Sequence, residues 1–136
     1  MKIYINSDRI DNLALKLARL QQRAKPAINE MLMNGSDFLI EALKRGCDSY
    51  GHVKTGGLRE SIDRKSPPEV TDDGGEVIVT FKGTNEHGVR YGAIMAYLNY
   101  GTSSIPADHW VDNTVAESMP IVTQIMNDTL NKHLNR

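Results

Sequence analysis

The amino-acid sequence predicts an α+β fold in a single domain that spans residues 1–136. Apolar residues recur at steps of three and four near both ends of the chain, which is typical of helices with one buried face. Between them, residues 76–82 alternate in polarity, which predicts a β-strand. We therefore expect a long N-terminal helical segment, a small antiparallel β-sheet and a long C-terminal helix around one core.

The first residues predict a short strand followed by a helix. Residues 2–6 alternate, with Ile3 and Ile5 on one side. Ser7 or Asp8 is then expected to cap the helix. The helix carries one apolar stripe, which indicates ordinary core packing. The stripe consists of Ile10, Leu13, Leu17, Leu20, Ala24, Ile28, Met31, Gly35, Phe38 and Ala42.

Pro26 lies in the middle of this stripe and predicts a break or a sharp kink. Proline removes one helical hydrogen bond and disfavours helical geometry at Lys25. One straight helix over residues 9–46 would be about 57 Å long, whereas a compact chain of this size has a radius of gyration of about 14 Å. The continuous stripe favours the alternative, a single helix. Gly46 is the expected end of the helix, with Gly51 as a later candidate.

The middle of the chain predicts a β-hairpin. The prolines at 67–68 exclude a central strand at that point. Residues 72–75, Asp-Asp-Gly-Gly, are typical of a turn, and the strand at 76–82 is expected to be the second arm of the hairpin. On one side of this strand lie Val77, Val79 and Phe81.

The rest of the chain predicts two further helices. Residues 91–98 carry apolar side chains at helical spacing, and a strand is the alternative interpretation. Gly101 lies where a left-handed cap would end this helix. Asp108 is expected to cap the long C-terminal helix, and Pro120 to kink it. The side chains expected to face the core are Val111, Val115, Val122, Ile125, Met126, Thr129 and Leu130.

Composition and charge limit the classes of function. The net charge of −1 does not favour nucleic-acid binding. Residues 1–65 hold 12 Lys and Arg against 8 Asp and Glu, whereas residues 66–136 hold 4 against 9. The two halves either neutralise each other within one subunit or form opposite faces that stack copies head to tail. Cys47 is the single cysteine and is expected to be buried in a helix. The chain lacks a membrane-spanning apolar run and a signal-peptide core, so we expect no export.

The sequence contains no recognisable motif for catalysis, a cofactor or a metal. None of the 4 histidines forms an HxH, HxxxH or HExxH pattern. His87 beside Glu86, or His109 beside Asp108, leaves a small hydrolase or toxin-like enzyme as one alternative. A nucleic-acid-binding module that uses the basic N-terminal half is a second alternative. We expect no catalytic, cofactor-binding or metal-binding residue.

The stretch HVKTGGLRESI predicts a compact turn into a helix. Thr55 is expected to cap the helix, because its hydroxyl can accept a backbone N–H of the next turn. Gly56 and Gly57 would let the chain pass close to another backbone. Leu58 and Ile62 would then share one buried face.

The stretch YLNYGTSSIPADHW predicts a corner between two helices. Gly101 ends the first helix after Tyr100, and the chain crosses over from Thr102. Pro106 stiffens the approach to the second helix, and Trp110 packs into the core.

Three blocks of the sequence resemble a tail-component family of long-tailed bacteriophages, the neck or tail-completion proteins of the minor tail protein Z type. Thr55–Ile62 resembles the family signature TGrLrdSI, Tyr91–Thr102 resembles its YaxxvEfGT block, and Pro106–Trp110 resembles PArPF. The order and spacing of the blocks also match. The residues that depart from the family pattern are Gly57, Asn99, His109 and Trp110.

The resemblance implies a structural virion protein that acts at the head–tail junction, in tail completion or head–tail joining, without catalysis or a cofactor. It implies docking to a portal-side connector, the tail tube or its terminator, and a homo-oligomeric ring, with no membrane and no specific nucleic acid. The expected location is the tail or neck of the virion, and the host cytoplasm during assembly. The motif residues expected to carry this architecture are Thr55, Gly56, Gly57, Leu58, Ile62, Tyr91, Tyr100, Gly101, Thr102, Pro106 and Trp110.

Overall fold

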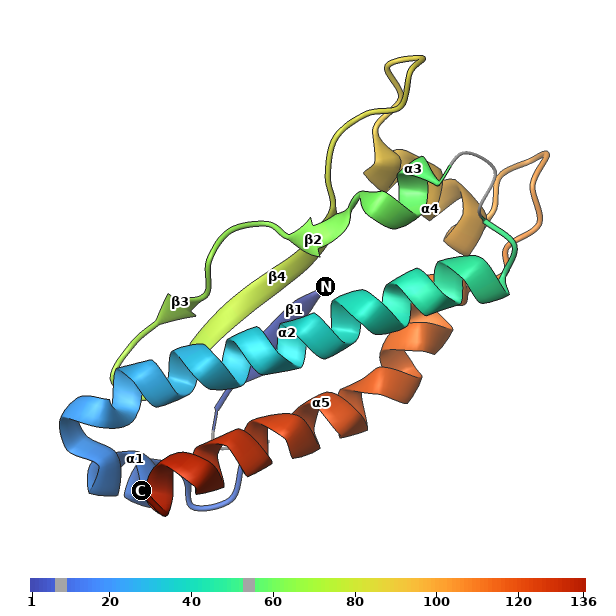
Figure 1. The fold of residues 1–136 in the computed structure, drawn as a ribbon. Helices are drawn as coiled ribbons and strands as arrows, with labels where there is room; N and C mark the ends of the chain where they lie inside the picture. Colours follow the sequence, from blue (N-terminus) through green and yellow to red (C-terminus); the bar gives the residue numbers. More distant parts are fainter. Residues whose placement is uncertain (7–9, 53–55) are drawn as a thin grey trace.

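Two long helices run side by side in opposite directions and pack along a small β-sheet (Figure 1). The computed structural model describes residues 1–6, 10–52 and 56–136. The long helices are α2 (Ala24–Ser49) and α5 (Trp110–Leu134), and they make the most extensive contact between any two elements. The α+β architecture expected from the sequence is confirmed.

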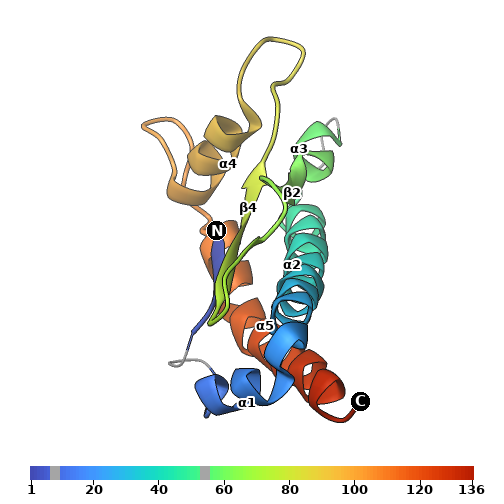
Figure 2. The same ribbon diagram turned by 90° about the vertical axis from the view of Figure 1, so that its left-hand side faces the viewer.

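The N-terminal segment contains a strand, a short helix and a 3₁₀ turn before α2. The strand β1 (Lys2–Ile5) buries Ile3 and Ile5, as expected from their alternation. Helix α1 (Leu13–Leu20) and the turn η1 (Gln21–Arg23) follow. Figure 2 shows α1 and the later helix α4 at opposite ends of the molecule, with β1 between them.

The predicted break in the N-terminal helical segment occurs just before Pro26. Gln21 has a φ of 52°, which no α-helix can continue through. Pro26 itself lies in the first turn of α2, where a backbone N–H has no partner within the helix, so proline is tolerated there. The predicted stripe is buried along its length, with Phe38 half-buried. The cap expected at Ser7 or Asp8 lies outside the described residues.

Helix α2 continues past Gly46, so the expectation that Gly46 ends it is wrong. The helix ends at Ser49, and Gly51, the alternative candidate, takes the left-handed conformation with a φ of 77°. A β-carbon at position 46 would lie 2.6 Å from Oγ1 of Thr114 on α5. Gly46 therefore serves the close packing of the two long helices, which its sequence neighbours do not reveal.

The sheet is built around the strand β4 (Gly75–Phe81). Strand β1 pairs with one side of β4, and the short strands β2 (Ile62–Arg64) and β3 (Glu69–Val70) pair with the other, all antiparallel. The prolines at 67–68 lie between β2 and β3, and β3 and β4 form the predicted hairpin. The side of β4 that faces the core carries Val77, Val79 and Phe81, which the alternation had placed together on one side.

Leu58 and Ile62 are both buried, but they do not share a helical face as expected. Helix α3 (Gly57–Glu60) is a single turn, and Ile62 already belongs to β2. Ile62 pairs with Phe81 of β4. This long-range strand pairing overrides the local helical spacing.

Residues 91–100 form a helix rather than a strand, in line with the preferred interpretation. Helix α4 (Tyr91–Tyr100) ends at Gly101, whose φ is positive as expected. With a φ of 81° and a ψ of 169°, Gly101 lies outside the left-handed helical region, in a conformation that is essentially restricted to glycine. The corner therefore restricts position 101 to glycine more strongly than an ordinary left-handed helix cap would.

Helix α5 begins one residue later than the expected cap suggests. The side chain of Asp108 accepts the backbone N–H of Trp110 at 3.0 Å, while His109 occupies the N-cap position without a side-chain cap bond. Pro120 lies inside α5, and Figure 1 shows the helix bending along its length. Of the predicted core residues, Val115 and Ile125 are half-buried and the others are buried.

Within the described ranges, no helix is long and apolar enough to span a bilayer.

Candidate functional site

Three stretches that are separate in the sequence meet at one end of the molecule. They are residues 51–52 with 56–62, residues 91–102 and residues 106–110, which include the described parts of the three blocks with the family resemblance. Helix α3 packs against α4, and α4 packs against α5, at the end of the molecule opposite α1 (Figure 1). The motif residues therefore contribute to one structural unit, although they are dispersed along the chain.

Gly57 makes room for the ring of Tyr91. A β-carbon at position 57 would lie 2.1 Å from the phenolic oxygen of Tyr91 and 2.8 Å from Cζ. The group that approaches Gly57 is thus an aromatic side chain, and not a backbone segment as expected. Gly56 occupies the N-cap position of α3 with a φ of 76°, which glycine adopts without strain. The cap expected at Thr55 lies outside the described residues.

A histidine–aspartate pair joins the chain after α2 to the start of α5. Nε2 of His52 lies 2.6 Å from Oδ2 of Asp108, with the two side chains 13% and 29% exposed. The other carboxylate oxygen accepts the N–H of Trp110. The rings of His52 and Phe81 lie edge-on to Trp110 at centroid distances of 5.5 and 5.8 Å. Trp110 is fully buried, as expected.

Sequence reasoning did not find the pair of His52 and Asp108. It considered each histidine with its sequence neighbours, whereas these partners are 56 positions apart. The only signal in the sequence was that His52 and Asp108 fall in two of the three motif stretches.

Asn99 caps α5 from outside that helix. Its side chain is fully buried, and Oδ1 accepts the backbone N–H groups of Val111 at 2.9 Å and Asp112 at 3.2 Å. These N–H groups have no partner within the helix, so the contact satisfies two donors at once. Nδ2 of Asn99 has no hydrogen-bond partner among the described residues. The sequence indicated Asn99 only as a departure from the family pattern.

The corner after α4 is narrow and is held by Thr102. A β-carbon at Gly101 would lie 2.8 Å from the backbone nitrogen of Ala107 and 2.9 Å from the carbonyl oxygen of Ile105. Oγ1 of Thr102 accepts the backbone N–H groups of Ser104 at 3.1 Å and Ile105 at 3.0 Å. Gly101 and Thr102 therefore fix the crossover that the sequence assigned to them.

Two tyrosines of α4 are left exposed at this end. Tyr97 is 47% exposed and Tyr100 is 62% exposed. They are three positions apart and lie on the same side of the helix. Pro106 of the crossover is also exposed. We refer to Tyr97 and Tyr100 as the tyrosine pair.

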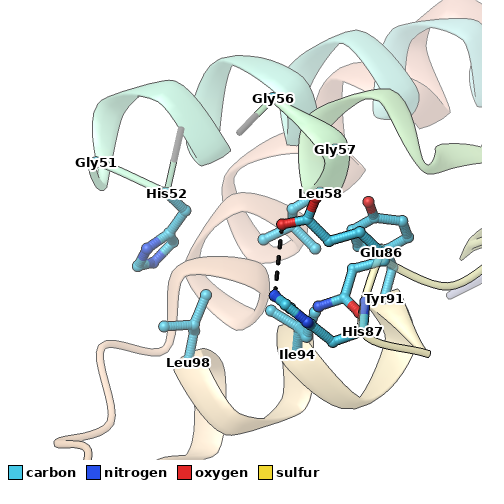
Figure 3. A pocket seen from close by; sticks show the side chains of 11 residues that line it. Gly51, His52, Gly56, Gly57, Leu58, Glu86, His87, Tyr91, Ile94 and Leu98 are labelled. Carbon is cyan, nitrogen blue, oxygen red and sulfur yellow. Dashed lines mark hydrogen bonds and ion pairs between the residues drawn. The ribbon is translucent and has the colours of Figure 1, made fainter. Parts of the chain in front are cut away.

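A groove of about 550 Å³ lies between α3, α4 and the loop that precedes α4 (Figure 3). Apolar side chains of both helices line one part of it, and Glu86 and His87 of the loop line another, 3.4 Å apart and each 78% exposed. Asn85 holds this loop, because its Oδ1 accepts the N–H groups of His87 and Val89. The lining residues are Gly51, His52, Gly56, Gly57, Leu58, Asn85, Glu86, His87, Tyr91, Ile94 and Leu98.

The groove has an apolar wall and a polar rim, which suits the binding of a side chain from another molecule. Among its described lining residues, the hydroxyl of Tyr91 is the only hydroxyl or thiol. His109 pairs with Asp112 at 3.4 Å on the exposed start of α5 and is not a lining residue. The two histidines considered for catalysis are therefore not brought together in this groove.

Cys47 lies beneath this end of the molecule and is fully buried, as expected. Its Sγ donates a hydrogen bond to the carbonyl oxygen of His52 at 3.1 Å. Burial, with a smaller contribution from the nearby Asp48 carboxylate, raises the pKa of the thiol to about 11.

Among the described residues there is no group of three or more His, Cys, Asp or Glu side chains that could hold a metal ion.

The comparisons with known proteins identify no relative. No protein-family model, no curated protein and no solved structure matches the chain. The resemblance of the three sequence blocks to the phage tail-component family therefore stays a prediction.

Proposed function

We propose that this chain is a structural virion protein of a long-tailed bacteriophage or prophage. It acts at the head–tail junction, in tail completion or head–tail joining, and works by self-assembly and docking without catalysis. The proposal is supported by the resemblance of three sequence blocks and by their contact at one end of the fold.

The observation that carries the proposal is how residues of the three blocks contact one another, including Gly57 and Asn99, which depart from the family pattern. Gly57 receives Tyr91, Asn99 caps α5, and Gly101 turns the corner between α4 and α5. Each of these contacts fixes the position of α4 on the rest of the fold. The tyrosine pair is then presented on a rigid support, and exposed tyrosines are enriched where proteins meet.

The charge contrast between the halves of the sequence supports docking less strongly than the tyrosine pair does. Among the described residues, two lysines of the N-terminal half pair with carboxylates of the C-terminal half, Lys2 with Glu76 at 3.4 Å and Lys25 with Asp72 at 3.6 Å. Part of the contrast is thus neutralised internally. We therefore expect the affinity for a partner to depend mainly on apolar contact and only weakly on salt.

The proposed partners are the neighbouring proteins of the neck, a portal-side connector on one side and the tail tube or its terminator on the other. In this proposal copies of the chain form a ring. A contact between unlike surfaces closes into a ring when its rotation divides a full turn, and the symmetry of a tail requires such closure. The protein is made in the host cytoplasm and ends in the tail or neck of the virion.

Deletion of the gene from its phage tests the role. We expect filled heads and separate or malformed tails by electron microscopy, with DNA replication unaffected, and recovery when the gene is supplied on a plasmid. Normal infectious particles from the deletion would refute the proposal.

Replacement of the tyrosine pair tests the surface. Tyr97→Ser with Tyr100→Ser should leave the melting temperature nearly unchanged, since both side chains are exposed, but should fail to restore infectious particles. Leu15→Ser is a matched control, because Leu15 is an apolar side chain on α1, 68% exposed, at the opposite end of the molecule. Full recovery with the tyrosine variant would show that this face does not dock.

A further inference from the structure

One edge of the sheet carries backbone groups that have no hydrogen-bond partner among the described residues. The backbone N–H of Val79 on β4 donates to the carbonyl oxygen of Met1 at 2.7 Å, so these two residues form a hydrogen-bonded pair. In an antiparallel pair of strands such pairs alternate along the strand. By the observed register, Ile3 and Ile5 are therefore the next residues that bond to β4. The N–H and C=O groups of Lys2 and Tyr4 point away from β4, toward the free edge.

The two edges of the sheet are not alike. The edge opposite β1 is divided into the short strands β2 and β3, with the prolines at 67–68 between them. Short strands and prolines are features that protect an edge from pairing with another chain. The edge at β1 is an unbroken strand of 4 residues without proline. Lys2 is its one charged residue, and its ammonium group is paired with Glu76 on the neighbouring strand.

Helices lie beyond both ends of the free edge. In both views β1 lies between α4 at one end of the molecule and α1 at the other (Figures 1 and 2). Lys2 and Tyr4 each present one N–H and one C=O along this edge, in the alternation that a further strand requires. These backbone groups favour an extended segment over a folded surface as the partner.

A second groove, of about 390 Å³, lies at the Met1 end of this edge. It lies between α4 and the first turns of α5, and apart from Asp112 and the tyrosine hydroxyl its lining side chains are apolar. Such a groove can take one side chain of a strand that runs along β1, because alternate side chains of a strand point to the same face. The lining residues are Met1, Met95, Tyr100, Val111, Asp112, Val115 and Ala116.

We propose that the edge of β1 binds an extended segment of a neighbouring neck or tail subunit, which adds a strand to the sheet. The segment bonds to the free backbone groups of Lys2 and Tyr4 and places an apolar side chain in the groove at Met1. The identity of the neighbour rests on the proposed function, whereas the strand addition rests on the geometry of the edge. Tyr100 lines this groove and belongs to the tyrosine pair, so the two surfaces are continuous.

The test removes one backbone N–H at the free edge by a substitution that keeps β1 paired with β4. Tyr4→Pro deletes an amide hydrogen that points away from β4 and places the proline ring on the free edge, where proline is tolerated. Tyr4→Thr loses the same ring but keeps the N–H, and is the matched control. Lys2→Pro is a second variant of the same design, in case Tyr4→Pro fails to fold. Amide exchange of Ile3 and Ile5 should stay as slow as in the wild type, which shows that β1 still pairs with β4.

Infectious titre after supply of each variant to the deletion phage is the first measurement. We expect Tyr4→Pro to lower the titre at least about tenfold, because the loss of one backbone hydrogen bond weakens binding by about that factor. We expect Tyr4→Thr to give the titre of the wild type. A wild-type titre with a folded Tyr4→Pro protein would overturn the proposal.

Peptide binding in solution is the second measurement and does not depend on the virion role. A displayed library of random peptides of about twelve residues is selected on the purified wild-type protein. We expect selected peptides that bind Tyr4→Thr but bind Tyr4→Pro at least about tenfold more weakly. Failure to select peptides, or peptides insensitive to Tyr4→Pro, would overturn the strand addition. If the wild-type protein forms dimers and the Tyr4→Pro variant does not, the edge binds a second copy of this chain. That result would overturn the proposal that a different neck or tail subunit binds the edge.

Discussion

The side-chain oxygen of Asn99 on α4 lies 2.9 Å from the backbone nitrogen of Val111 on α5. This contact connects two helices across the crossover that Gly101 begins. It also satisfies donors of α5 that no residue of α5 can reach. One buried amide therefore contributes to the position of α4, and with it to that of the tyrosine pair.

We expect Asn99→Ala to destabilise the protein by about 1–2 kcal/mol, because it removes a helix cap and leaves the N–H groups of Val111, which is buried, and of Asp112 without this acceptor. Urea unfolding followed by circular dichroism measures the change. Asn113→Ala is the control, since Asn113 makes an exposed hydrogen bond to Tyr50, and should cost less than about 0.5 kcal/mol. Equal stability of the two variants would contradict the capping role of Asn99.

Gly57→Ala tests the contact between the first two motif blocks. The added methyl group would meet the ring of Tyr91, so we expect a loss of about 1–3 kcal/mol from overpacking. In a Tyr91→Ala background the same change should cost much less, because the obstructing ring is gone. The four proteins of this cycle are compared by chemical denaturation. A cost that is the same in both backgrounds would show that Gly57 does not serve Tyr91.

Gly101→Ala tests the corner after α4. The backbone conformation at Gly101 is strained for any other residue, and the β-carbon would press on Ala107, so we expect a loss of about 1–3 kcal/mol. Gly92→Ala in the same helix is the control. A β-carbon at Gly92 has no neighbour closer than 3.9 Å, and alanine favours helix by about 1 kcal/mol over glycine. Thermal melting that fails to separate the two variants would contradict the corner.

The thiol of Cys47 should react slowly with disulfide reagents in the native state. Burial raises the pKa of the thiol from its ordinary value of 9.0 to about 11, so the thiolate fraction near pH 8 falls about a hundredfold. The raised pKa also means that ionisation opposes folding, and stability should decline as the pH rises above the unfolded value. The rate at which Cys47 reacts with a disulfide reagent is measured with and without denaturant. Equal rates in both conditions would contradict the buried position.

The sequence predicted those parts of the fold that depend on local periodicity. The stripe of the N-terminal helix, the alternation of β4 and the helix at 91–100 can each be recognised within one short window. Pro26 located the break closely, because proline fits the first turn of a helix without the loss of a hydrogen bond that it causes further along. Positive φ at Gly101 was likewise predictable from its place after a helix.

The remaining features depend on partners that are distant in the sequence. Gly46 was expected to end α2, but it is needed inside the helix because Thr114 packs against it. His52 pairs with Asp108 across 56 positions, and neither residue type specifies such a partner. The role of Asn99 as a cap for another helix was equally invisible, because capping residues are normally sought next to the helix they cap.

The most direct test of the central claim is quantitative mass spectrometry of purified particles from the phage or prophage that encodes this chain. A structural neck or tail protein should be present in several copies per particle, and should remain with the tail fraction or the neck fraction when heads and tails are separated. Absence of the chain from purified infectious particles would contradict the account.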